Sequence, residues 1–252
     1  MKYFLLVLSL VLFCTCSTSV KNNSEDWIIL FDGTSLDGWR AYNGKQMPPG
    51  WKIVNKELTF TTEQILEKDY NYEGSRDIIY CAEEFDNFEL YVEWSIPAGG
   101  NSGIFYHIKE GYEAPYFVAP EYQLVDDLNY TKIHNLTNYN THTGANEPEQ
   151  LKDWQKTAAD YAMYAPDPAH KILNPVGQWN TSKIIFTPEN VEYWLNGKKV
   201  LSFIPWSQDW NERKNSGKWK GAPDYGKYKK GYIGFQDHGS NLSFRNIKIK
   251  KI

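Results

Sequence analysis

The segment PEYQLVDD (Pro120–Asp127) holds residues whose types and spacing suit chemistry in this 252-residue chain. If the segment forms a strand, Glu121 and Gln123 point to the same face because side chains alternate along a strand. A carboxylate can transfer a proton and a neighbouring amide can hold a hydroxyl group. Asp126 and Asp127 close the segment. The pattern is compatible with a solvated strand edge or with a site for sugar chemistry.

Two further segments, GNSGIFYHI (100–108) and GYIGFQDHG (231–239), also alternate. Ile233 and Phe235 form an apolar face in the second segment, which predicts a core position for both. The opposite faces hold Gly103, Phe105 and His107 in the first segment, and Tyr232, Gly234, Gln236 and His238 in the second. If these faces line one concave sheet, we expect a groove that binds carbohydrate hydroxyl groups.

The chain holds five histidines. His107 and His238 lie on the polar faces, and His142 lies in the glycine-containing loop THTGAN. These three are candidates for proton transfer or for metal ligation, and a structural hydrogen-bonding role is the alternative. His134 and His170 lie in segments that resemble loops, so we expect them at the surface.

Compact metal or nucleophile motifs are absent from the sequence: it has no HExxH, no paired CxxC and no G-x-S-x-G. A divalent metal ion bound by dispersed residues stays open, with Glu121, Asp126 and His142 as candidate ligands. The net charge of −4 argues against a nucleic-acid partner, which requires clustered basic residues. Ten Trp and 18 Tyr suit strand faces and stacking on sugar rings.

The N-terminal segment MKYFLLVLSLVLFCTCS has a basic start, a short apolar stretch and then small residues, which predicts an export signal. Cys16 in this context resembles the lipidated cysteine of a bacterial lipoprotein, so we expect a signal over residues 1–16 and a lipid anchor at Cys16. Residues 17–26 then form a tether. The expected location is the cell envelope, in the periplasm or at the outer membrane, with ordinary secretion as the alternative.

Residues 27–252 are expected to form one domain in which most elements are short strands separated by turns. Asn55-Lys56 and Asn196-Gly197 stand between alternating segments and predict tight hairpins. Short helices are predicted only in Glu147–Tyr164 and Pro205–Lys214, inside long insertions that suit site building rather than a core. Many strands with few helices predict an all-β fold, an antiparallel jelly-roll sandwich.

The combined motifs resemble the 3-keto-disaccharide hydrolase family over about Trp27 to Ile252. The segments that carry the resemblance are LFDGTSLDGW, GWKIVNKELTF, FELYVEWSIPAGGNSGIFYHI, PEYQLVDD, HTGAN, NPVGQWNTSKIIF, VEYWLNGKKV and GYIGFQDHGSNLSFRNIKI. The resemblance implies a concanavalin A-like jelly-roll of two antiparallel sheets. It also implies activity on glycosides that are already oxidised to a ketone at C3 of the sugar.

This chemistry suggests roles for the candidate residues. A C3 ketone acidifies the C2 hydrogen, so a base can form an enolate and the C1 substituent can leave, after which hydration completes a net hydrolysis. Glu121 is the expected catalytic carboxylate, with His107, His142 and His238 as further catalytic candidates, and a divalent cation would stabilise the enolate. The expected substrate-binding residues are Gln123, Gln236, Asn101, Arg245, Tyr106 and Trp39.

Direct hydrolysis by two carboxylates is the mechanistic alternative. Related β-glucanases carry E-x-D-x-E on one strand, whereas this chain has Gln123 at the middle position and Asp126 out of register, which disfavours that chemistry. A non-catalytic carbohydrate-binding surface lipoprotein is the functional alternative, because the fold also serves lectins. Such a module needs aromatic and amide groups but no base, so Glu121 and the histidines favour the enzyme. An interaction domain of a surface complex would leave these titratable groups unexplained.

Overall fold

The computed structural model describes residues 27–61, 76–134 and 150–252. The predicted signal, the Cys16 anchor, the tether and His142 lie outside these residues. Within the described ranges, none of the helices has both the length and the apolar character needed to cross a membrane.

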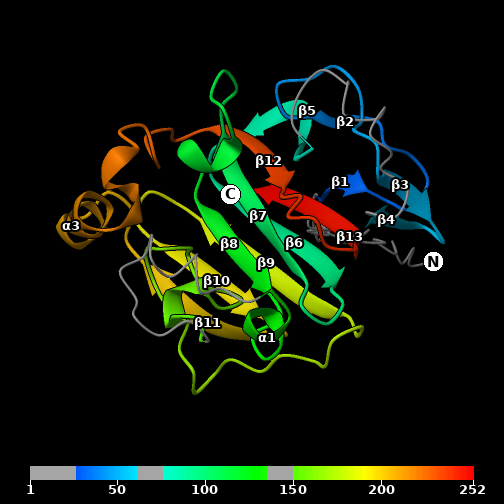
Figure 1. Cartoon of the computed structure of the whole chain (residues 1–252). Coiled ribbons are helices and arrows are strands. Elements are labelled where there is room, and N and C mark those ends of the chain that lie inside the picture. The colour runs from blue at the N-terminus through cyan, green and yellow to red at the C-terminus, as the bar shows by residue number, and fades with distance from the viewer. Residues whose placement is uncertain (1–26, 62–75, 135–149) are drawn as a thin grey trace, which may run out of the picture.

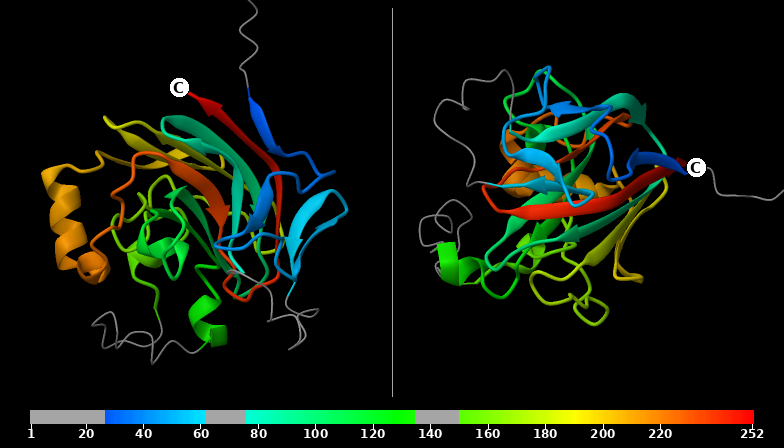
Figure 2. Two further views of the ribbon diagram at one scale, coloured as in Figure 1. Left: turned by 90° about the horizontal axis from the view of Figure 1, so that it is seen from above. Right: turned by 90° about the vertical axis from the view of Figure 1, so that its right-hand side faces the viewer.

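Two antiparallel sheets pack face to face and form the predicted all-β jelly-roll sandwich (Figures 1 and 2). The larger sheet contains β1 (Ile28–Phe31), β3 (Trp51–Val54), β4 (Glu57–Phe60), β6 (Phe88–Ser95), β9 (Asn180–Phe186), β10 (Val191–Leu195), β11 (Lys198–Phe203) and β13 (Leu242–Lys251). The smaller sheet contains β2 (Trp39–Ala41), β5 (Ile78–Phe85), β7 (Asn101–Ile108), β8 (Glu121–Val125) and β12 (Gly231–Phe235). The strand orders are β11-β10-β9-β6-β13-β4-β3, with β1 paired to β13, and β2-β5-β12-β7-β8.

The core between the sheets follows from the two-residue period of the strands. Every second residue of β6 is buried, from Phe88 to Trp94, and the intervening residues are half-buried. Ile233 and Phe235 of β12 enter the same core from the smaller sheet, as predicted. Phe235 stacks on Phe244 with ring centroids 4.1 Å apart, so aromatic contacts join the two sheets.

Both predicted hairpins are confirmed. Asn196 and Gly197 have φ values of 47° and 78° and connect β10 to β11. Asn55 and Lys56 have φ values of 52° and 65° and connect β3 to β4. Positive φ at both central residues is the geometry of a primed two-residue turn, which matches the twist of the strands.

The helical elements are α1 (Tyr130–His134), α3 (Gln208–Ser216) and the 3₁₀ turns η2 (Pro115–Phe117), η3 (Asp153–Gln155) and η4 (Lys218–Gly221). The helix predicted within Pro205–Lys214 is confirmed by α3, which Ser207 caps by accepting a hydrogen bond from the Trp210 amide. The helix predicted within Glu147–Tyr164 is wrong for the described part, residues 150–164. Only η3 forms there, because the following backbone pairs with β8 instead: the Gln123 amide donates to Ala159 O at 3.1 Å.

The smaller sheet is covered on both faces, so every residue of β7 and β8 is buried. One face packs on the larger sheet. On the other face Phe105 and Ile79 form a second apolar cluster with Val118 and Ala119, which follow η2. This second covered face also holds a cavity lined by Glu121 and Gln123 of β8.

Candidate active site

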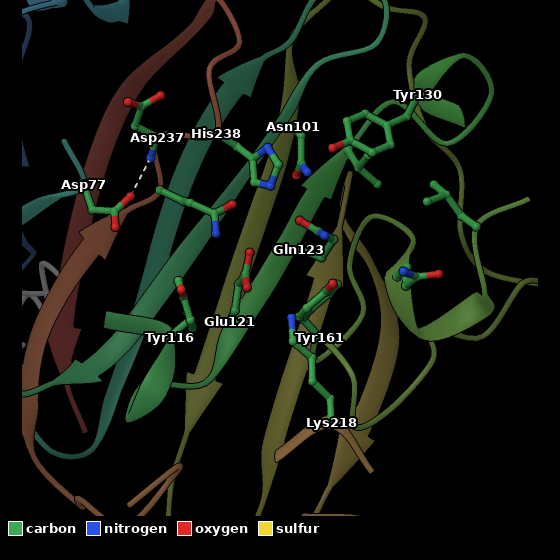
Figure 3. Close-up of a pocket in the computed structure, with 14 residues that line it drawn as sticks. Asp77, Asn101, Tyr116, Glu121, Gln123, Tyr130, Tyr161, Lys218, Asp237 and His238 are labelled. Carbon is green, nitrogen blue, oxygen red and sulfur yellow. Dashed lines mark hydrogen bonds between the residues drawn. The ribbon is translucent and has the colours of Figure 1, made fainter. Parts of the chain in front are cut away.

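A cavity of about 350 Å³ opens over strands β7 and β8 of the smaller sheet and the segment that follows β12 (Figure 3). Its walls come from η2, α1, η4 and residues 151–161. The lining residues are Asp77, Asn101, Tyr116, Glu121, Gln123, Val125, Tyr130, Leu151, Gln155, Tyr161, Lys218, Gln236, Asp237 and His238. The strands therefore supply a rigid floor, and the insertions supply the walls.

Glu121 and Gln123 both point into the cavity, which confirms the predicted face of β8. Their exposed fractions are only 3% and 5%. Gly103 on the neighbouring strand makes room for Glu121: a Cβ atom at Gly103 would lie 2.1 Å from Glu121 Oε1. A glycine is therefore required at position 103, because the Glu121 carboxyl group approaches the backbone there so closely.

Burial raises the pKa of Glu121 to about 8. The Lys218 ammonium opposes this shift, whereas Asp77 and Asp160 add to it. Among the described residues, none forms a hydrogen bond with the Glu121 carboxyl group. A carboxyl group that is buried, oriented by packing and without a hydrogen-bond partner in the described part of the chain is suited to proton exchange with a ligand near neutral pH.

Lys218 stands at the mouth of the cavity on η4, and its side chain points inward (Figure 3). Its Nζ lies 4.2 Å from the centroid of the Tyr161 ring and 4.8 Å from that of Trp219. The turn is fixed to the wall because Trp219 Nε1 donates to Tyr161 O at 3.1 Å. The surrounding protein lowers the pKa of Lys218, and the Glu121 charge raises it.

Two further acids, Asp77 and Asp237, lie on the opposite side of the cavity (Figure 3). The Asp237 amide donates to Asp77 Oδ1 at 2.8 Å, and Arg76 Nε lies 2.9 Å from Asp237 Oδ2. Burial raises the pKa of Asp237. Sequence reasoning missed these acids and also missed Lys218 and Tyr161. The only indication of Asp237 in the sequence is that it follows Gln236. The only indication of Lys218 is that it lies in a long insertion.

Asn101, Gln236 and His238 lie in the cavity as predicted. Asn101 is 6% exposed, and its Oδ1 has no hydrogen-bond partner among the described residues. His238 lies at the exposed rim, 6.4 Å from the Tyr130 ring between centroids, and the surrounding protein lowers its pKa. The structure therefore brings together Glu121, Gln123 and these three residues.

The predicted position of His107 on the polar face is wrong. His107 has a φ of 56°, and the pairing of β7 with β12 shifts register beside it, so a bulge turns the ring into the core. There its Nε2 bonds to Asp86 O at 2.9 Å, and its ring lies 4.4 Å from that of Phe186. Burial lowers the pKa of His107 to about 4.

Three predicted substrate-binding residues do not reach the cavity. Tyr106 faces the core, where its hydroxyl group lies 2.9 Å from that of Tyr193. Trp39 is also buried, and its Nε1 donates to Leu30 O at 2.7 Å. Arg245 belongs to the larger sheet, where it pairs with Glu93 at 2.7 Å.

The metal candidates do not form a site in the part of the chain that the structure describes. Asp126 lies outside the cavity, and both its carboxylate oxygens accept hydrogen bonds, from the Gly99 amide and from the Leu128 and Asn129 amides around the start of α1. No three His, Cys, Asp or Glu side chains gather closely enough within the described ranges to hold a metal ion. His142 lies outside those ranges.

Comparison with known proteins places this architecture among relatives. The profile of a family described as 3-keto-alpha-glucoside-1,2-lyase-like domain matches residues 26–250. The chain is 31% identical over 254 residues to a 3-keto-disaccharide hydrolase of Bacteroides thetaiotaomicron, covering 93% of this chain and 81% of that protein. A solved structure from Parabacteroides distasonis, provisionally described as a glycosyl hydrolase, is 39% identical with a TM-score of 0.76 and coverages of 90% and 94%. A second structure from that organism, at 21% identity and a TM-score of 0.60 with coverages of 90% and 99%, shares the fold.

Proposed function

Because the chain belongs to the family of 3-keto-alpha-glucoside-1,2-lyase-like domains, we propose that it cleaves glycosides that carry a ketone at C3 of the sugar ring. The relative from Bacteroides thetaiotaomicron bears the name 3-keto-disaccharide hydrolase, and the 39% identical structure is described as a glycosyl hydrolase. Both names agree with a cavity of about 350 Å³ whose lining of hydroxyl, amide and carboxyl groups suits a sugar.

The observation that carries the proposal is the Glu121 carboxyl group, which is 3% exposed, lies in the cavity and has a pKa of about 8. A ketone at C3 makes the C2 hydrogen acidic enough for removal by a side-chain base. The electron pair then forms an enolate, the C1–O bond breaks as the C3 carbonyl reforms, and water adds to the C1–C2 double bond. The sum of these steps is hydrolysis.

Glu121 acts as the base in this scheme. A pKa of about 8 leaves roughly a tenth of the groups ionised at pH 7, but the ionised form is a stronger base than an ordinary glutamate. The amide groups of Gln123 and Gln236 and the unpartnered Oδ1 of Asn101 orient hydroxyl groups of the sugar. His238 at the rim is a second candidate for proton transfer.

A divalent cation at the ketone would also stabilise the enolate. The described residues do not gather a ligand set that fits such an ion, so we assign no step to a metal. A chelator therefore enters the test as a separate arm.

The test compares a 3-keto-glucoside with the matching unoxidised glucoside, with and without chelator, and follows aglycone release. We expect release from the keto sugar alone, with exchange of the C2 hydrogen in heavy water. Glu121→Gln should abolish both release and exchange, whereas Gln123→Ala should weaken substrate binding more than turnover. Equal losses in the two variants would refute the role of Glu121. Tight binding of glycosides without any release would instead indicate a carbohydrate-binding module.

We also propose that the protein is exported and anchored through a lipid on Cys16, because the first 16 residues have the pattern of a lipoprotein signal. Mass spectrometry of the mature N-terminus tests this. Diacylated or triacylated Cys16 is the expected product, and a cleaved but unmodified N-terminus would indicate ordinary secretion.

A further inference from the structure

We propose that Lys218 is a catalytic residue whose ammonium group binds the C3 oxygen while that oxygen carries the negative charge of the enolate. The inference rests on the proposed function and assigns a role in it to a residue that no sequence motif singles out. In this proposal Glu121 on β8 is the base and Lys218 on η4 is the cation.

The described lining of the cavity is poor in positive charge. Lys218 is the single Lys or Arg among the described residues that line the cavity, whereas Asp77, Glu121 and Asp237 are all acids. Tyrosines and amides can donate hydrogen bonds to an oxyanion, but only Lys218 adds a full positive charge. The Lys218 side chain is exposed, so its charge stabilises a developing opposite charge most strongly once the bound sugar displaces the water around it.

The ammonium group of Lys218 lies against aromatic rings. Lysines elsewhere in the domain form ion pairs, such as Lys109 with Glu84 at 2.6 Å. The Nζ of Lys218 instead lies over two aromatic faces, those of Tyr161 and Trp219, and forms no ion pair among the described residues. Aromatic faces favour the charged form but accept none of its N–H groups in a strong hydrogen bond, so these donors stay available to a ligand.

Lys218 lines the same cavity as the proposed base. Lys218 and Glu121 point into the same space from different elements (Figure 3), and the pKa of each responds to the charge of the other. A ketone oxygen directed at Lys218 would place the neighbouring C2 hydrogen on the side of Glu121. The two groups thus match the two ends of the H–C2–C3=O unit.

The step balances without any further reactant. Glu121 takes the proton from C2, the C–H electron pair forms the C2–C3 double bond, and the carbonyl π electrons move to the oxygen beside Lys218. Lys218 stays protonated and forms no covalent bond. When the carbonyl group reforms, the electrons return through C2 to form the C1–C2 double bond and expel the C1 oxygen, which takes up the proton that Glu121 removed from C2.

The test is a pair of substitutions on the full domain. Lys218→Met keeps the length of the side chain and removes the charge, and Lys218→Arg keeps the charge. We expect Lys218→Met to lower kcat for a 3-keto-glucoside by about 10²- to 10³-fold, with KM changed by a few-fold at most, as for the loss of one oxyanion donor. Lys218→Arg should recover part of kcat. Lys220→Met is the matched control, because Lys220 is exposed on the same turn, as Lys218 is, but lies outside the cavity lining.

The outcomes separate the two levels of the proposal. If the wild-type protein does not release the aglycone from the keto sugar, the proposed function fails and this inference falls with it. If the wild type is active but Lys218→Met keeps kcat within about threefold, the function stands and the role of Lys218 is refuted. A covalent adduct at Lys218, trapped with cyanoborohydride in the presence of the keto sugar, would also overturn the inference, because the amine would then be a nucleophile. A melting temperature like that of Lys220→Met shows that Lys218→Met is folded.

Discussion

Gly103→Ala should disable the site without changing any group that takes part in the chemistry. The new Cβ atom would lie 2.1 Å from Glu121 Oε1 and 2.7 Å from its Cγ and Cδ, whereas ordinary contacts begin at 3.4 Å. The carboxyl group must therefore move by roughly 1 Å. A displacement of this size at a reacting group typically costs about 10²-fold in rate, which corresponds to about 2.7 kcal/mol of transition-state free energy.

The assay is kcat/KM for a 3-keto-glucoside, read beside thermal unfolding. Gly221→Ala is the control, because a Cβ atom there meets no atom within 4 Å and the residue does not have a positive φ. We expect Gly103→Ala to lose about 10²-fold in kcat/KM while Gly221→Ala stays near the wild type. A folded Gly103→Ala protein with wild-type kcat/KM would show that the position of Glu121 does not matter, and the reasoning would fail.

Three further predictions follow from buried or partnered acids. The kcat/KM of the wild type should rise with pH and level off above about 8, because Glu121 must ionise to act as a base; a profile that falls through the same range would make Glu121 an acid. Asp160 is fully buried, and burial raises its pKa to about 8. The folded state therefore keeps a proton that the unfolded state releases near pH 4, so stability should fall by up to about 1.4 kcal/mol per pH unit for this group between those values. Urea unfolding should show a weaker fall in Asp160→Asn, and an unchanged slope would contradict the assignment. Asp126→Ala should lower stability by about 1–3 kcal/mol, because the buried Gly99 amide and the partly buried Leu128 and Asn129 amides lose their acceptor, yet kcat should change little; a large loss of kcat would contradict the placement of Asp126 outside the active site.

The sequence predicted the parts of the fold and site that depend on local periodicity. Alternation placed Glu121 and Gln123 on the cavity side of β8, and it placed Ile233 and Phe235 in the core. The β8 assignment holds because β8 pairs with β7 without a shift of register, so a two-residue period maps directly onto two faces. Ile233 and Phe235 keep their common face although the pairing of β12 shifts register beside Ile233.

Local irregularity explains the failure at His107. The residue fits the polar face of an ideal strand, but its φ of 56° breaks the alternation and turns the ring to the core. A bulge of this kind depends on the partner strand, where Gly231 leaves space: a Cβ atom there would lie 2.4 Å from the backbone carbon of His107. No pattern within the segment Asn101–Ile108 reports what lies on the neighbouring strand.

The walls of the cavity could not be predicted for a different reason. Lys218 and Tyr161 come from insertions far from β8 in sequence, and long-range packing brings them to Glu121. Residues 157–164 form no helix because β8 offers them backbone partners, as in the hydrogen bond of 3.0 Å from the Tyr161 amide to Glu121 O. The pairing of this segment with β8, which prevents the predicted helix, also places the Tyr161 ring beneath Lys218.

The sign of the charge at Lys218 bears on the choice between the two mechanisms. Direct glycoside hydrolysis passes through an oxocarbenium-like transition state, whose positive charge an adjacent ammonium group would destabilise. An enolate is negative, so the same group stabilises it. Asp77 shares the cavity with Glu121 and could supply the second carboxylate of a direct mechanism, so the number of acids does not decide the matter. Lys218→Met does: it should slow an elimination, whereas it should leave a direct hydrolysis unchanged or make it faster.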